Sequence, residues 1–174
     1  MILIVNIGIP GSGKSSMSEY IKKQLSLSNI SCSICNADFY HIIDGKYQWQ
    51  EKNAFIAHLK NGNHCKKELL KKDVCIYDNT NTNKEDFRSI VFYARKYNAK
   101  VLAVLFLPKE VESHFNQGTH NVSIEKLKGY RDAIDTVDTT VFDNVYKIDC
   151  NDSFEKNSKI YDTIIEDIKN LKEE

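Results

Sequence analysis

Residues 8–15, with the sequence GIPGSGKS, constrain the fold of this chain more than any other segment. They follow a branched apolar run at residues 2–7 and precede a stretch, residues 16–27, whose apolar side chains recur at helical spacing. A strand, a glycine-rich loop and a helix in this order are the context in which G-x-x-x-x-G-K-[ST] binds phosphate. Glycines let backbone N–H groups converge on phosphate oxygens, and the helix N-terminus adds partial positive charge. The motif therefore predicts a P-loop that binds a nucleoside triphosphate.

Individual residues of this loop have separate expected roles. Lys14 reaches the β- and γ-phosphates of ATP as a point charge, and the Ser15 hydroxyl is the expected Mg²⁺ ligand. We therefore expect ATP and Mg²⁺ as cofactors. The alternative, a glycine-rich turn that binds no ligand, leaves the lysine and the hydroxyl unexplained. The other loop residues expected to contact ATP are Gly11, Ser12, Gly13 and Ser16.

Length and composition favour one domain in a reducing compartment. The 174 residues suit a single domain with a substantial core, and the formal net charge is zero. No apolar run approaches the roughly 20 residues of a membrane helix, and the first residues form a core strand instead of a signal peptide or anchor. The five cysteines are an odd number without a second metal-binding pair, so we expect them to be reduced. These features predict a cytoplasmic protein that does not associate with a membrane.

The periodicity of the remaining chain indicates the fold class. Further β-rich apolar segments occur at residues 30–35, 74–77, 100–107 and 145–148. Segments with helical spacing lie at about 50–72, with an interruption at residues 61–63, and at 83–98, 109–117, 124–137 and 155–172. Five strands alternating with helices predict a doubly wound α/β fold, with a five-stranded parallel sheet flanked by helices. In such folds ligands bind beyond the carboxyl ends of the strands.

Two carboxylates follow strands at that edge of the predicted sheet. Asp38 ends the second strand, where it takes the proton of an acceptor hydroxyl as a general base or orients the nucleophile. Asp78 ends the third strand, where it holds Mg²⁺ through water or binds the acceptor. The structural alternatives are a cap of the following turn for Asp38 and a turn-forming residue for Asp78. Arg88, on the next helix, reaches the substrate, braces the two acids, or is one surface arginine.

A basic and aromatic region lies between the two acids in the sequence. Residues 39–48 are expected to form a loop, and the helical region 50–72 carries six lysines and two histidines against two glutamates. Such a strip either follows a nucleic-acid backbone or is a solvated helix face. Tyr40, Tyr47 and Trp49 either stack on a base at the substrate mouth or pack in a core or hinge.

Three of these segments together resemble the polynucleotide 5′-hydroxyl kinase family. They are residues 8–15, 36–40 (NADFY) and 77–82 (YDNTNT), and the similarity continues through residues 118–123. The family includes the kinase domain of the bacteriophage polynucleotide kinase/phosphatase and the kinase-like domain of NEDD4-binding protein 2. Many kinases share the phosphate loop alone, whereas the Asp-Asn-Thr-Asn-Thr block is more specific.

The resemblance implies transfer of the ATP γ-phosphate to the 5′-hydroxyl of DNA or RNA. Asp38 falls on the general base of the family, and Lys14 and Ser15 fall on its phosphate and magnesium contacts. The resemblance also implies a single P-loop kinase domain over residues 1–174, with a helical lid at about 109–135. The catalytic residues would be Lys14, Asp38 and Arg88. The acceptor contacts would be Asp38, His41, Asp78, Thr80, Asn81 and Arg88.

Two positions depart from the pattern of the family. His41 stands where the phage enzyme has an arginine. Gln117, expected to contact ATP, stands where the family has a lid arginine beside the phosphates. An amide does not neutralise developing phosphoryl charge as a guanidinium does, and an arginine finger raises rates ~10³–10⁵-fold.

The main functional prediction is an ATP-dependent polynucleotide 5′-hydroxyl kinase, as used in nucleic-acid repair, whose partner is the 5′-OH end of DNA or RNA. Two alternatives stay open. One is a P-loop kinase of a small hydroxyl compound or nucleotide, which the near-neutral charge and the few arginines favour. The other is a non-catalytic ATP-binding module, which Gln117 favours. The first alternative predicts that a small hydroxyl compound or nucleotide is a better acceptor than any oligonucleotide. The second predicts that the chain binds ATP but phosphorylates no acceptor.

Overall fold

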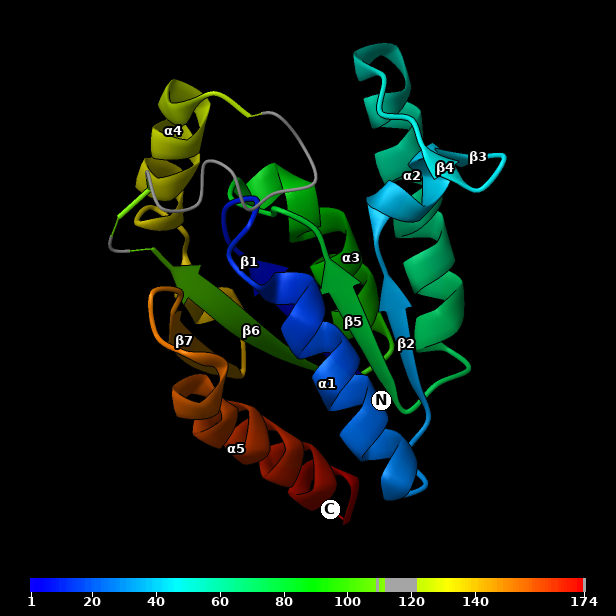
Figure 1. Cartoon of the computed structure of the whole chain (residues 1–174). Coiled ribbons are helices and arrows are strands. Elements are labelled where there is room, and N and C mark those ends of the chain that lie inside the picture. The colour runs from blue at the N-terminus through cyan, green and yellow to red at the C-terminus, as the bar shows by residue number, and fades with distance from the viewer. Residues whose placement is uncertain (109, 112–121, 174) are drawn as a thin grey trace.

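The computed structural model describes residues 1–108, 110–111 and 122–173 (Figure 1). A five-stranded parallel sheet has the strand order β2-β5-β1-β6-β7, which confirms the predicted α/β architecture. Its strands are β1 (Ile2–Ile7), β2 (Cys32–Cys35), β5 (Val74–Asp78), β6 (Lys100–Leu107) and β7 (Asn144–Asp149). The helices are α1 (Lys14–Leu27), α2 (Glu51–Leu69), α3 (Lys84–Lys96), α4 (Ile124–Ile134) and α5 (Phe154–Glu173).

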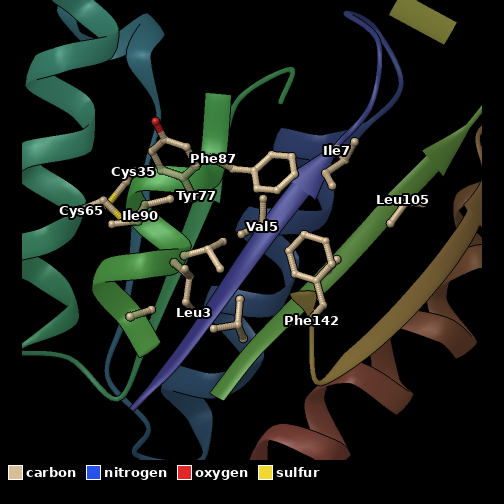
Figure 2. Packing of buried hydrophobic residues seen from close by; sticks show 14 of the residues in the cluster. Leu3, Val5, Ile7, Cys35, Cys65, Tyr77, Phe87, Ile90, Leu105 and Phe142 are labelled. Carbon is tan, nitrogen blue, oxygen red and sulfur yellow. The ribbon is translucent and has the colours of Figure 1, made fainter. Parts of the chain in front are cut away.

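Helices cover both faces of the sheet, so its central strand is buried throughout. All six residues of β1 are buried, as expected for a parallel strand whose sequence is an almost continuous apolar run. Alternate side chains enter different cores, because successive residues of a strand point to opposite faces. Leu3, Val5 and Ile7 join a cluster with α2, α3 and α4 (Figure 2), whereas Ile2 and Ile4 join one with α1 and α5. Each fully buried aliphatic side chain stabilises the fold by about 1.5–3 kcal/mol.

The second helix differs from the sequence prediction. Residues 61–63 do not interrupt it, and α2 runs unbroken from Glu51 to Leu69. The reason is tertiary: Asn61 is fully buried, and its amide donates to the Cys35 carbonyl oxygen at 3.3 Å. That bond offsets the weak helix propensity of the Asn-Gly-Asn segment.

The segment between β2 and α2 also has more structure than a loop. A 3-10 turn, η1 (Ala37–His41), follows β2 directly. A small antiparallel hairpin comes next, formed by β3 (Ile42–Ile43) and β4 (Lys46–Tyr47). Figure 1 shows this hairpin beside the outer half of α2, beyond the edge of the main sheet.

Part of the predicted lid lies outside the described residues. Helix α4 falls within its range of about 109–135, but residues 109 and 112–121, and with them Gln117, are not described. Among the helices that are described, none is both long and apolar enough to cross a membrane.

Substitution of two glycines by alanine should change the stability of the fold in opposite directions. A Cβ on Gly8 would lie 2.7 Å from the Cβ of the buried Phe106, whereas a Cβ on Gly62, inside α2, meets no atom within 4 Å. We expect Gly8→Ala to lower the free energy of unfolding by about 1–3 kcal/mol, because a packed core resists added volume. We expect Gly62→Ala to raise it by about 0.5–1 kcal/mol, because alanine restricts the unfolded chain and favours helix. Urea denaturation of both variants measures these changes, and a stabilised Gly8→Ala would contradict the packing described.

Candidate nucleotide-binding site

The loop between β1 and α1 has the geometry of a phosphate cradle. Gly11 and Gly13 have positive φ angles of 79° and 88°, a conformation that residues with a Cβ rarely adopt. Gly13 is also the N-cap of α1, and no side chain at this position caps the first N–H groups of the helix. Ser15 and Ser16, in the first turn, are exposed. Backbone donors, hydroxyls and the helix dipole therefore converge where the sequence predicted phosphate binding.

The Lys14 ammonium lies folded back inside this loop. Its Nζ donates to the carbonyl oxygens of Gly8 at 3.0 Å and Ile9 at 2.7 Å, and lies 3.4 Å from the Ser12 hydroxyl. Burial lowers the pKa of Lys14 to about 8, although the Asp78 carboxylate opposes this effect. A buried cation bonded only to neutral oxygens has much to gain from an anionic ligand.

Asp78 is buried at the end of β5 and accepts from two amides, one in β1 and one just after β2. Its Oδ1 accepts from Asn6 Nδ2 at 3.1 Å, and its Oδ2 accepts from Asn36 Nδ2 at 3.4 Å. Asn6 Nδ2 also donates to the Ser18 hydroxyl of α1 at 2.8 Å. This network holds the ends of β1, β2 and β5 against α1. Sequence reasoning missed Asn6 and Ser18, because one polar residue in an apolar strand or helix gives no separate signal.

Asp38 lies on η1, next to the end of β2. Its backbone N–H donates to the Asn36 side chain at 2.8 Å, so Asn36 caps the turn. The cap is therefore not the role of the Asp38 carboxylate, which was the structural alternative. Instead, that carboxylate accepts from the Tyr47 hydroxyl at 3.4 Å. The carboxyl ends of β1, β2 and β5 share one edge of the parallel sheet, so Asp38 and Asp78 lie at the same edge as Lys14.

The Asn-Thr block after Asp78 forms part of the framework. Asn79 Oδ1 accepts from the Ala37 N–H at 3.0 Å and thereby ties this loop to η1. The Asn81 amide donates to the carbonyl oxygens of Asn6 at 2.8 Å and Tyr77 at 3.2 Å, and the side chain is 2% exposed. The Thr80 carbonyl accepts from the Gly8 N–H at 3.0 Å. This geometry gives Asn81 a structural role and does not support the expected acceptor contact.

Polar groups without partners concentrate at this edge of the sheet. In the part of the chain that the structure describes, four buried side-chain atoms have no hydrogen-bond partner: Asn6 Oδ1, Asn61 Oδ1, Asn79 Nδ2 and Thr82 Oγ1. Each such group costs about 1–3 kcal/mol, so native proteins keep few of them. Asn6 and Asn79 lie where β1 and β5 end, and the Asn61 amide on α2 lies 3.4 Å from Asn79 Oδ1.

Two other predicted residues make their described contacts elsewhere, on the hairpin and on α3. His41 is 3% exposed and packs its ring 6.1 Å from that of Tyr47, under the hairpin. Arg88 forms an exposed pair with Glu85 at 3.9 Å and lines a groove on α3, so the structure does not bring it to the two acids. Its catalytic role stays a prediction. Gln117 lies outside the described residues.

A glycine loop between a buried strand and a helix, with a buried lysine and an acid on the neighbouring strand, defines a P-loop protein of the kinase-like fold. The family model described as chromatin associated protein KTI12 matches residues 1–166, and the chain therefore belongs to the KTI12 family. Human NEDD4-binding protein 2 is 34% identical over 134 residues, which cover 73% of this chain and 7% of that much longer protein. The predicted resemblance to that protein is confirmed, but these matches support a P-loop kinase-like family and not the polynucleotide kinases specifically.

Solved structures agree on the fold. Kti12 from Chaetomium thermophilum, determined in complex with ADP-AlF3, has a TM-score of 0.68 at 16% identity, covering 95% of this chain and 98% of that one. A gluconokinase from Sinorhizobium meliloti has a TM-score of 0.65 at 13% identity, covering 98% and 95%. Shikimate kinase from Aquifex aeolicus has a TM-score of 0.56 at 14% identity, covering 98% of both chains. The predicted P-loop kinase fold is thus confirmed.

The buried Lys14 gives the stability of the free protein a distinctive pH dependence. Its pKa is 10.5 ordinarily and about 8 in the folded chain, so unfolding takes up a proton between these values. The free energy of unfolding therefore rises with pH across that interval, by up to about 3 kcal/mol from this group. Urea denaturation of the native chain and of Lys14→Met is measured between pH 8 and 10.5. Because both proteins contain the same tyrosines, the difference between their pH profiles reports the contribution of Lys14. Parallel pH profiles for the two proteins would contradict the burial of a charged Lys14.

Proposed function

We propose that this chain is an ATP-binding module of the KTI12 family that turns over ATP at the carboxyl edge of its sheet. The observation that carries the proposal is the buried Lys14 ammonium, bonded to its own glycine loop beside the amide-bound Asp78. The complex of the Chaetomium thermophilum Kti12 with ADP-AlF3 supports it, because that relative has the same fold and family.

The residues present fit ATP and Mg²⁺. Backbone N–H groups from Gly11 onward and the Lys14 ammonium would hold the phosphates, and the exposed Ser15 hydroxyl and the Asp78 carboxylate would face the metal. No three acidic, histidine or cysteine side chains of the described residues form a metal cage. Mg²⁺ takes one or two protein oxygens and completes its shell with phosphates and water. When bound, Mg²⁺ neutralises phosphate charge.

The proposal gives Asp38 the proton of the attacking hydroxyl. In the proposed step the oxygen of water or of an acceptor forms a bond to the γ-phosphorus, and the bond to the bridging oxygen of ADP breaks. The hydroxyl proton passes to the Asp38 carboxylate, which the Tyr47 hydroxyl orients at 3.4 Å. Lys14 exchanges its carbonyl partners for phosphate oxygens and compensates their negative charge.

A second candidate, the polynucleotide 5′-hydroxyl kinase, rests on a separate observation. Exposed aromatic side chains surround Asp38, and Trp49 beyond the hairpin is 50% exposed. Lys46, Lys52 and Lys60 are exposed on the hairpin and α2. Stacking surfaces with nearby cations suit single-stranded nucleic acid. The aromatic residues concerned are Phe39, Tyr40, Tyr47 and Trp49.

The first experiment separates binding from turnover. We expect Lys14→Ala to weaken Mg-ATP binding by roughly 10- to 100-fold, because it removes charged hydrogen bonds to phosphate. We expect Asp38→Asn to bind Mg-ATP within about twofold of the affinity of the native chain. We expect it to convert ATP to ADP about 10²–10⁴-fold more slowly. Titration calorimetry and a coupled ADP assay measure the two quantities. Unchanged binding by Lys14→Ala would refute the site, and unchanged turnover by Asp38→Asn would remove it as general base.

The acceptor is tested by transfer of labelled γ-phosphate to 5′-hydroxyl oligonucleotides of DNA and RNA. A polynucleotide kinase labels the 5′ end, and Asp38→Asn abolishes the label. Trp49→Ala lowers labelling roughly tenfold if the indole stacks on a base. Leu70→Ala, at the far end of α2 and 46% exposed, serves as the control and keeps full labelling. ATP turnover without labelled oligonucleotide would exclude this candidate and leave water or a small hydroxyl compound as acceptor.

A further inference from the structure

One buried side chain of α2 is polar where its neighbours along the helix are apolar. Helix α2 packs against β2, β5 and η1, and Figure 2 shows Cys65 of α2 beside Cys35 of β2. Asn61 lies one helical turn from both Ala57 and Cys65, which are buried, and is itself fully buried. Apolar residues usually occupy such a stripe, and a buried amide there needs hydrogen bonds to offset the loss of water. The partners of Asn61 therefore indicate why this position is polar.

The amide nitrogen of Asn61 joins α2 to two neighbouring segments. It donates to the Cys35 carbonyl oxygen at the end of β2 at 3.3 Å, and to Asn79 Oδ1 just after β5 at 3.4 Å. The same Asn79 oxygen accepts from the backbone N–H of Ala37, the first residue of η1, at 3.0 Å. A chain of hydrogen bonds therefore runs from α2 through Asn79 to the turn that carries Asp38.

The partners determine how both amides are oriented. A backbone N–H needs an acceptor, so the atom of Asn79 that faces Ala37 is its oxygen. A carbonyl needs a donor, so the atom of Asn61 that faces Cys35 is its nitrogen. The other two atoms, Asn61 Oδ1 and Asn79 Nδ2, are buried without a partner among the described residues. Unpaired buried groups lower stability, so stability alone does not explain two amides at this place.

The bond from Asn79 also fixes η1 relative to the sheet. Asn36, which precedes the turn, accepts from the Asp38 N–H at 2.8 Å and donates to the carboxylate at the end of β5 at 3.4 Å. The bond from the Ala37 N–H to Asn79 is shorter than that second link, at 3.0 Å, and is buried. Two asparagine oxygens thus hold consecutive N–H groups of η1, and α2 supports one of them.

We propose that Asn61, acting through Asn79, is a positioning residue for the Asp38 carboxylate. The inference rests on the proposed function, in which this carboxylate takes the proton of the attacking hydroxyl. Displacement of such a group by about 1 Å lowers a rate by about 10²-fold. Asn61 bonds to β2 and to the loop after β5, and among the described residues it has no bond to the glycine loop. Its loss should therefore slow turnover without weakening the binding of Mg-ATP.

The test compares Asn61→Ala with a matched control, Asn63→Ala, which removes an exposed asparagine from the same helix. We expect Asn61→Ala to lower kcat for ADP formation about tenfold and to leave the KM for ATP within about twofold of the native value. Asn63→Ala should keep both values. In the double variant with Asn79→Ala, kcat should be no lower than in Asn79→Ala alone, because Asn61 acts through Asn79. A coupled ADP assay measures these constants, and circular dichroism checks that each variant is folded.

Amide hydrogen exchange tests the same link without any turnover. NMR of the isotope-labelled chain follows the N–H groups of η1 individually. We expect the Ala37 N–H to exchange about tenfold faster in Asn61→Ala than in the native chain, because its acceptor loses support. The Ile4 N–H, in the central strand, should keep its native rate in Asn61→Ala. Asn63→Ala should change neither rate.

Several results would overturn the positioning role. They are native kcat in Asn61→Ala, a loss in the double variant that is the product of the two single losses, and unchanged exchange at Ala37. A raised KM with native kcat would assign Asn61 to ATP binding instead. A native chain that forms no ADP would refute the proposed function itself, and the exchange rate of Ala37 would then decide alone whether Asn61 holds the turn. If Asn61→Ala does not fold, native kcat in Asn79→Ala overturns the proposal.

Discussion

The buried positive charge of Lys14 is the interaction on which the nucleotide edge of the sheet depends. An ammonium taken out of water needs oxygen partners, and the chain supplies two carbonyls from the loop and a carboxylate, Asp78, nearby. Asp78 in turn needs donors, which Asn6 provides from β1 and Asn36 provides from the residue that follows β2. Placing these groups requires β1 to pair with β5 so that Asn6 lies beside Asp78. One buried cation thus determines the polar residues at the ends of three strands.

The sequence alone predicted those features whose signal is local. Continuous apolar runs identified the five main strands, and the carboxyl ends of parallel strands brought Lys14, Asp38 and Asp78 to one edge without any coordinates. Features that depend on tertiary contacts were missed. Asn61 was read as a helix interruption, although its burial against Cys35 keeps α2 continuous. Asn6 was read as part of an apolar strand, although it organises the acid.

The Asp-Asn-Thr-Asn-Thr block is a better guide to the family of this chain than to its substrate, and the structure gives the reason. Asn79 ties the loop to the turn that carries Asp38, and Asn81 joins the ends of β1 and β5. Both amides act on the protein's own backbone, so proteins with different acceptors have the same reason to keep them. The fold and the family are thus established, while the acceptor remains a proposal.

The strand order has a consequence for how the protein is made. Strand β1 is synthesised first, yet Ile2 pairs only with Val74 of β5 and Lys100 of β6. Until those strands leave the ribosome, the five apolar residues of β1 have no sheet to join. Pairings so distant in sequence make folding slow and expose apolar surface to aggregation. The phosphate loop at residues 8–15 therefore becomes a binding site only after β5 and β6 have also been translated.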